Sequence, residues 1–572
     1  MNQTSRTDDT LHHPGWNQNP PPLNADETTR QDLNGIANAR EQRDHTLQVT
    51  GPGDGSLQSG ILPVPHDSSD LPASKEGSTG LVLAASAADQ PPDRSKALTI
   101  QCSVPRALQP LVKFAAFVGP GFLVAVAYID PGNYATDVAA GAQSRYALLF
   151  VVFLSNLFAI FLQSLCIKLG SVTGLSLAEN CRLHLPRWLV VILYLFAESA
   201  IVATDISEVI GSAIALNLLL KIPLVWGCII TLADVLFMLL FYRPNGSMWG
   251  LRAFEFFVMA LVLGVVICFC IQLSLIKYES VGVVFRGYLP SAAVVQGGGL
   301  YQSCGILGAT VMPHSLFLGS GTVQPRLKEF DVNQGYVEDP TSLTDNGEDS
   351  SYRPSIHAIR GCLKYSIIEL TLSLFTFALF VNSAILIVAA AALYGTPGAA
   401  DADLFGIYNL LSNSISPAAG TIFALALLLS GLSAGIVCTI AGQIVSEGMI
   451  QWTLKPWIRR LLTRSISIIP SVIIAAAVGK DGLNTALTAS QVVLSVILPF
   501  VIAPLVYFTC RNRYMTVQVG GRCGEVGEEE GPQPETVKMR NSWPVSVLAV
   551  LVWIAITVLN VALLVLVGLG DA

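Results

Sequence analysis

Charged residues are scarce in this chain. Asp, Glu, Lys and Arg make up 13% of its 572 residues, whereas hydrophobic residues make up 52%. Together with a mean hydropathy of +0.56, this excludes an ordinary soluble domain and predicts a polytopic membrane protein with polar appendages. The net charge of -7 comes largely from acidic tails and loops, so it points to neither nucleic acid nor an anionic membrane surface as a partner.

The sequence also lacks a disulfide framework and the pattern of a cleaved signal peptide. It contains no CxxC pair, and most cysteines lie in or beside apolar stretches: Cys166, Cys228, Cys268, Cys270, Cys304, Cys438 and Cys510. We expect these thiols to be small, buried, apolar side chains. Because the first residues show no basic-then-apolar pattern, we expect the first true span to direct insertion.

About eleven apolar stretches follow a polar N-terminal segment, and their length of roughly 20 residues matches a bilayer core of about 30 Å. They cover residues 114–142, 146–168, 188–216, 222–242, 253–275, 298–321, 365–394, 417–446, 465–479, 484–510 and 543–569. We therefore expect an all-α polytopic membrane protein with about 11 transmembrane helices. Insertion into a lipid bilayer follows from this fold class.

The basic residues of the connecting loops predict the orientation. One set of loops carries many of them, including Arg459, Arg460 and Arg464. The opposite set holds only Arg145, Lys221, Lys277, Arg286 and Lys480. The positive-inside rule places the N-terminus in the cytosol and, with an odd number of spans, residues 570–572 outside. The sequence leaves open whether the membrane is plasma, endosomal or vacuolar.

The first apolar stretch is interrupted at its middle by the sequence Asp130-Pro131-Gly132-Asn133. Proline costs about 3 kcal/mol and glycine about 1 kcal/mol in a helix interior, and an Asp near the bilayer centre costs about 2.5–3.5 kcal/mol. We interpret the cluster as a broken helix whose freed carbonyls, with Asp130 and Asn133, form a cation site. The alternative is a proline kink with a hydrogen-bonded Asp.

The stretch from residue 298 to 321 is interrupted in the same way at Met312-Pro313, and His314 follows directly. Ala309 and Met312 are three residues apart, as are Asp130 and Asn133, so each pair can face one side of a half-helix. Interrupted spans in corresponding halves point to a binding site at the membrane midplane. Since these spans are the first and the sixth, we expect a LeuT-type 5+5 inverted repeat with broken helices 1 and 6.

This architecture divides the chain into parts. They are a disordered cytoplasmic N-tail (1–105), a first five-helix repeat (106–296), a second five-helix repeat (297–510) with a cytoplasmic acidic loop (329–355), a cytoplasmic loop (511–542) and an extra C-terminal helix (543–572). In the tail, Lys75 and Lys96 are candidates for ubiquitin-type regulation, although exposed lysines are usually just solvated.

Met312 bears on the choice of ion. Mg²⁺ and Ca²⁺ prefer all-oxygen ligands, whereas a thioether favours softer ions such as Mn²⁺, Fe²⁺, Co²⁺ or Cd²⁺. The alternative is that Met312 only packs, as most membrane methionines do.

The stretch from residue 188 to 216 contains three acids, Glu198, Asp205 and Glu208. Such a density of intramembrane carboxylates is typical of a water-filled or proton-conducting path, although Glu208 could instead form a structural ion pair. A histidine can titrate near neutral pH, so His314 is a candidate proton relay. Arg464 either pairs with these acids or anchors its helix at the membrane border.

Six motifs in the same order resemble the Nramp family of divalent-metal transporters, and especially its fungal-type Smf members with long polar N-tails. They are DPGN at 130–133, ESAIVATDISEVIG at 198–211, MPHS at 312–315, GLSAGIVCTIAGQIVSEG at 431–448, LTRSISIIP at 462–470 and SQVVLSVILPF at 490–500. The resemblance covers residues from about 114 to 510.

The resemblance implies proton-coupled uptake of Mn²⁺, Fe²⁺ and related ions toward the cytosol, by a transporter and not an enzyme. The metal is the transported substrate, the proton is the coupling ion, and no cofactor is expected. Carried over by motif position, the metal ligands are Asp130, Asn133, Met312, the Ala309 carbonyl and, in some conformations, Gln491. The proton route would comprise Asp130, His314, Glu198, Asp205, Glu208 and Arg464.

The chain departs from the common family pattern at two positions. Many members have Asn after MPH and a second His five residues beyond the first, where this chain has Ser315 and Gly319. A proton route that needs the second histidine is therefore in question. The alternatives are a relative that moves Mg²⁺ or Al³⁺, which Met312 argues against, a sensor on the same fold that does not transport, and a symporter for organic cations or amino acids.

Overall fold

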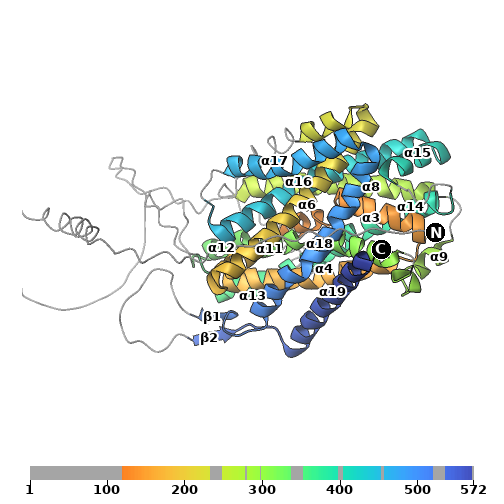
Figure 1. Ribbon diagram of the computed structural model, residues 1–572. Helices are drawn as coiled ribbons and strands as arrows, with labels where there is room; N and C mark the ends of the chain where they lie inside the picture. Colours follow the sequence, from red (N-terminus) through yellow and green to blue (C-terminus); the bar gives the residue numbers. More distant parts are fainter. Residues whose placement is uncertain are drawn as a thin grey trace, which may run out of the picture. The chain divides into compact units, whose positions relative to one another are not determined.

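The computed structural model describes residues 119–231, 248–276, 280–296, 298–336, 352–396, 403–452, 456–519 and 535–569 (Figure 1). The N-tail expected over 1–105, with Lys75 and Lys96, lies outside these residues, as does the segment 570–572.

The described residues form helices joined by short connections. In the first half of the chain these are α2 (Pro120–Val126), α3 (Pro131–Ser144), α4 (Leu149–Thr173), α5 (Leu177–His184), α6 (Arg187–Leu220), α8 (Met248–Leu275), α9 (Val281–Arg286) and the 3₁₀ turn η1 (Ala292–Val294). In the second half they are α10 (Gly299–Thr310), α11 (Pro313–Gly321), α12 (Gln324–Asn333), α13 (Ile356–Ser373), the π-helical turn η3 (Leu374–Ala378), α14 (Leu379–Leu393), α15 (Leu404–Ser414), α16 (Pro417–Ile450), α17 (Pro456–Ala477), α18 (Lys480–Thr509) and α19 (Trp543–Leu569).

The prediction of a helical membrane protein is confirmed. Among the described residues, 8 helical segments are long and apolar enough to cross a membrane, and Leu461–Ala477 is a shorter apolar helix. The expected stretch 222–242 is described only up to residue 231, and its described part is helical from residue 224. In Figure 1, α12 and the strands lie at one end of the bundle, and α9 and α15 lie at the other.

Two connections differ from the expectation. The connector predicted over 511–542 contains an antiparallel pair of strands, β1 (Thr516–Val519) and β2 (Glu535–Lys538), so the chain is not purely helical. The loop predicted to begin at residue 329 is still helical up to Asn333, where α12 ends. Both segments are too short and too polar for their apolar pattern to reveal them.

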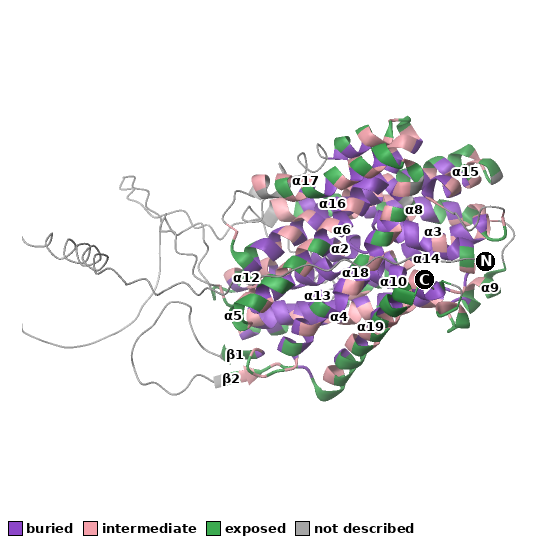
Figure 2. Ribbon diagram, in the orientation of Figure 1, coloured by how far each residue is buried: buried purple, intermediate pink, exposed green. Residues whose placement is uncertain are grey.

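Burial separates a central group of helices from a peripheral one (Figure 2). In the most apolar part of α16, 67% of the residues are buried inside the protein, whereas in the most apolar part of α19 only 22% are. The C-terminal helix therefore presents most of its surface outward. The cysteines follow the prediction in the described residues, where all are free and most are buried, although Cys270 is exposed.

Candidate metal site

The first helix interruption lies between α2 and α3. After Val126, the N–H groups of Ala127, Tyr128 and Ile129 bond to carbonyls three residues earlier, and α3 then begins at Pro131. The unwound residues thus precede the proline. Pro131 is the first residue of α3, where its missing N–H leaves no helical bond unmade. The sequence pattern instead predicts the break at Pro131 and Gly132.

Asp130 and Gly132 define the start of α3. Asp130 is the N-cap, and its Oδ1 accepts the backbone N–H of Asn133 at 2.9 Å. This is the capping interaction that favours Asp at this position. Gly132 allows a close approach of α18, since a Cβ atom there would clash with the side-chain amide of Gln491. Gln491, implied as a ligand by resemblance, is therefore placed beside the break.

The second interruption lies between Thr310 and Pro313, as predicted. Met312 is the N-cap of α11 and is fully buried. Its carbonyl accepts a hydrogen bond from Ser315 Oγ at 2.8 Å. Pro313 has no N–H to donate to the Ala309 carbonyl four residues earlier, so the hydrogen-bond ladder of α10 cannot continue through it. Ala309, one turn earlier, is also fully buried.

The two interruptions meet at the side chain of Asn133. Its Nδ2 lies 2.7 Å from Asp130 Oδ1, 3.2 Å from the Tyr128 carbonyl and 3.1 Å from the Ala309 carbonyl. Three oxygens therefore surround the position of Asn133 Nδ2. One belongs to the Asp130 carboxylate, and the other two are the backbone carbonyls of Tyr128 in the unwound segment and Ala309 near the end of α10. An amide nitrogen has two hydrogens and cannot satisfy three acceptors equally.

This arrangement is suited to a cation. Rotation of the Asn133 amide by 180° brings Oδ1 to the same place, so that four oxygens from two helix breaks would face one ion. Carboxylate, carboxamide and carbonyl oxygens are ordinary ligands of divalent cations. Asp130 has no cationic side chain within 4 Å among the described residues, and Ser207 Oγ donates to its Oδ2 at 3.3 Å.

His314 lies close to the break, at the start of α11. It is buried, and its Nδ1 is 3.3 Å from Thr204 Oγ1 on α6. Thr204 is one turn before Ser207, which contacts Asp130. The histidine, the hydroxyls and the carboxylate thus lie along one side of α6.

The acids of α6 divide into two groups. Asp205 and Glu208 both accept hydrogen bonds from Arg464 of α17, in the latter case at 3.2 Å, and all three residues are buried. Arg464 is thus an ion-pair partner and not a border anchor. Glu198, two turns earlier, instead accepts a hydrogen bond from Tyr194 at 2.9 Å.

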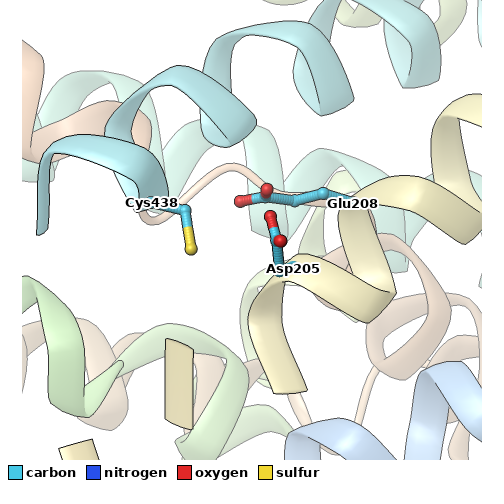
Figure 3. A group of neighbouring side chains, drawn as sticks. All are labelled: Asp205, Glu208 and Cys438. Carbon is cyan, nitrogen blue, oxygen red and sulfur yellow. The ribbon is translucent and has the colours of Figure 1, made fainter. Parts of the chain in front are cut away.

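Cys438 of α16 completes the Asp205 group (Figure 3). Its Sγ and one oxygen each from Asp205 and Glu208 lie within 4.8 Å of one another. Although these are metal-ligand atoms, the Arg464 guanidinium bonds to both carboxylates and balances one of their two negative charges, so we interpret the group as an ion-pair cluster. It borders a small cavity that Arg464, Thr463 and Gln443 also line.

Several residues around the site are not predicted from the sequence. Asn382 of α14 donates to the Tyr128 carbonyl at 3.1 Å and to Asn133 Oδ1 at 3.4 Å. A single amide in the apolar stretch 365–394 was the available signal for it. Gln163 of α4 donates to Tyr128 Oη at 2.9 Å and to the Ser315 carbonyl at 2.9 Å. Tyr128 contributes partly through its backbone carbonyl, and a backbone contribution cannot be predicted from the residue type.

Comparison with known proteins identifies the family. The model described as "Natural resistance-associated macrophage protein-like" matches residues 121–526. The manganese transporter pdt1 of Schizosaccharomyces pombe is 54% identical over 458 residues, 80% of this chain and 86% of the relative. The iron transporter SMF3 of Saccharomyces cerevisiae is 50% identical over 477 residues, 81% of this chain and 98% of the relative.

A solved structure agrees with these matches. The Eremococcus coleocola manganese transporter in complex with an aromatic bis-isothiourea substituted compound has a TM-score of 0.64 and 35% identity, over 80% of this chain and 87% of that chain. The fold, the two helix interruptions and the sequence matches lead to one conclusion: the chain belongs to the natural resistance-associated macrophage protein (Nramp) family.

Proposed function

We propose that this protein is a proton-coupled symporter that imports divalent transition-metal ions, Mn²⁺, Fe²⁺ and related Co²⁺ or Cd²⁺, toward the cytosol. The observation that carries the proposal is the meeting of Asp130, Asn133 and the Ala309 carbonyl where two helices are interrupted. Relatives named as manganese and iron transporters support the choice of substrate.

In this proposal the transported ion is held by Asp130, Asn133, the Ala309 carbonyl and Met312, and Gln491 joins in some conformations. Asp130 supplies the negative charge that replaces hydration of the ion. The Met312 thioether favours the softer ions over Mg²⁺ and Ca²⁺. This argues against the alternative of an Mg²⁺- or Al³⁺-type relative, and the intact oxygen site argues against a sensor that does not transport.

The proton leaves Asp130 along α6. Ser207, Thr204 and His314 provide hydroxyl and imidazole groups next to Asp130. Asp205 and Glu208 continue the polar side chains on the same helix, where Arg464 of α17 bonds to both of them, and Glu198 lies two turns from Asp205 along α6. An ion pair whose members can exchange a proton with neighbouring water suits this role better than a charge facing lipid.

The metal site is closed in the described conformation. Asp130, Asn133 and Met312 are all fully buried. The Glu369 carboxylate of α13 accepts the backbone N–H groups of Gly119 at 2.6 Å and Gly121 at 3.1 Å, which holds the start of α2 in place. Transport therefore requires movement of the half-helices that flank each break.

The full architecture is part of the proposal. We infer about 11 transmembrane helices, with repeats over 106–296 and 297–510 in a LeuT-type arrangement, and an added C-terminal helix over 543–572. The end that carries α12, β1 and β2 would face the cytosol, since the basic loops cluster there. The membrane is the plasma membrane or an endosomal or vacuolar one, and ubiquitin-type modification of the tail would control turnover.

Proteoliposomes that enclose a pH-sensitive dye test the proposal. With protein incorporated, an inward Mn²⁺ gradient should produce metal entry together with acidification of the lumen at clamped voltage. Metal entry without acidification would leave a voltage-driven metal uniporter. No entry of Mn²⁺, Fe²⁺ or Co²⁺ into vesicles that contain folded protein would overturn the transport function itself.

A further inference from the structure

A second buried carboxylate lies on the same half-helix as Asp130. Asp137 of α3 is 1% exposed, and neither of its oxygens has a hydrogen-bond partner among the described residues. Buried carboxylates are almost always paired or hydrogen-bonded, because an isolated one costs several kcal/mol or more. Its environment is therefore incomplete without a bound cation or proton.

The position of Asp137 relates it to the metal site. It follows Asp130 by seven residues, which is about two helical turns and about 10 Å along the axis, so both carboxylates lie on nearly the same face. Since α3 runs from the break toward the end of the bundle with α9 and α15, Asp137 lies on that side of the metal site (Figure 1).

Contacts made by neighbouring residues of α3 give the level of Asp137 along α10. Along α10, Asn133 bonds to the Ala309 carbonyl, and Gly305 faces the methyl group of Thr136. The next turn of α10 carries Gln302, whose Oε1 is buried without a hydrogen-bond partner in the described part of the chain. Asp137 and Gln302 therefore lie at similar heights along the bundle.

Contacts between α3 and α14 also give the level of Asp137. Asn382 bonds to Asn133, and two turns further on Gly141 packs against the backbone of Leu386 and Ala390. The level of Asp137 falls between these contacts. Ser383 directly follows Asn382, so it lies nearer to the level of Asn133, and its buried hydroxyl is next to the Tyr288 hydroxyl. Asp137 of α3 and Gln302 of α10 thus place two buried oxygen-bearing side chains at this level, and neither the Asp137 oxygens nor Gln302 Oε1 has a hydrogen-bond partner among the described residues.

We propose that Asp137 is the carboxylate of a second cation site, which receives the divalent ion before it reaches Asp130. Gln302 would provide a neutral oxygen ligand. This inference rests on the proposed transport function. Because the donors are all oxygen and include no thioether, the site binds Mn²⁺ more weakly than the Asp130 site and discriminates less against Ca²⁺ and Mg²⁺.

Mn²⁺ titration of the purified full-length protein in lipid nanodiscs tests the second site, with free Mn²⁺ followed by electron paramagnetic resonance. The wild-type protein should bind two ions of unequal affinity. Asp130→Ala should retain the weaker one, and Asp137→Asn should retain only the tighter one. As a matched control, Asp331→Asn neutralises a buried carboxylate on α12 that three hydrogen bonds already satisfy, and it should retain both.

Uptake kinetics provide the second readout. Asp137→Asn should raise the KM for Mn²⁺ by about tenfold, equivalent to about 1.4 kcal/mol, with little change in the maximal rate. If Asp137→Asn does not fold, Asp137→Ser replaces it in both measurements. Wild-type binding and a wild-type KM in the folded variant would show that the carboxyl is simply protonated, and this would overturn the second site alone. Unchanged uptake by Asp130→Ala would instead overturn the proposed function.

Discussion

The buried acids near the metal site form two groups, Asp130 alone and the pair Asp205 and Glu208, and different kinds of partner stabilise them. Among the described residues, the groups that donate hydrogen bonds to Asp130 are neutral, and they include Asn133 and Ser207. Asp205 and Glu208 bond to the guanidinium of Arg464, which is itself buried. The second group carries its own counter-charge, whereas the first lacks one among the described residues.

This difference separates a site for cargo from a site for internal charge. A carboxylate surrounded by neutral donors and backbone carbonyls can accept an external cation without displacing a side chain. An acid pair bonded to arginine would have to release that arginine first, at a cost of several kcal/mol. The metal-ligand chemistry around Cys438 is therefore a weaker indication of a metal site than the oxygens around Asn133.

The largest effect is expected from removing the first carboxylate. Asp130→Ala should reduce ⁵⁴Mn uptake to background, because it removes the negative charge that the ion needs at the two helix breaks. Surface labelling must show that the variant still inserts. Near wild-type accumulation would refute the site assignment.

Removing the counter-charge of the second group should mainly affect stability. Arg464→Gln leaves two buried acids without their cation and should lower the free energy of unfolding by about 3–5 kcal/mol. Thermal melting of the detergent-solubilised protein measures this. The double variant Arg464→Gln with Asp205→Asn should regain part of the loss, and a double variant no more stable than Arg464→Gln alone would argue against a coupled cluster.

Selectivity should change without loss of transport when the thioether is removed. Met312→Ala keeps the oxygen ligands, so Mn²⁺ and Cd²⁺ uptake should weaken by about tenfold while Ca²⁺ and Mg²⁺ begin to compete. Competition assays with each ion measure the change. Equal Ca²⁺ inhibition of wild type and variant would mean that the thioether does not determine selectivity.

The smallest effect concerns the coupling ion. An inside-negative potential contributes about 2.3 kcal/mol per elementary charge per 100 mV, so voltage must be clamped to reveal coupling. Mild external acidification should then raise the uptake rate a few-fold. His314→Ala combined with Asp205→Asn should flatten this response and leave Mn²⁺ binding largely unchanged. A double variant with the wild-type pH response would remove both residues from the proton route.

The sequence by itself determined the helical membrane class, the second interruption and the identity of the candidate ligands. These follow from local properties: long apolar stretches, prolines within them, and acids or amides that are costly in lipid. Two apolar stretches contain such costly residues, at Asp130-Pro131-Gly132-Asn133 and at Met312-Pro313. In the structure their helices lie together, joined by the hydrogen bond from Asn133 to the Ala309 carbonyl. The tertiary structure moved the first interruption to the residues before Pro131.

Only the tertiary structure decided the partners. Arg464 was equally consistent with a border anchor until α17 was placed against α6. Asn382, Gln163 and Cys438 are ordinary residues in apolar stretches, and their roles arise from contacts with residues more than a hundred positions away in most cases, such as Asn382 with Tyr128. The lack of a hydrogen-bond partner for Asp137 among the described residues is likewise a property of packing. Local sequence records which groups are costly to bury, but which neighbour compensates each of them depends on helix packing over long sequence separations.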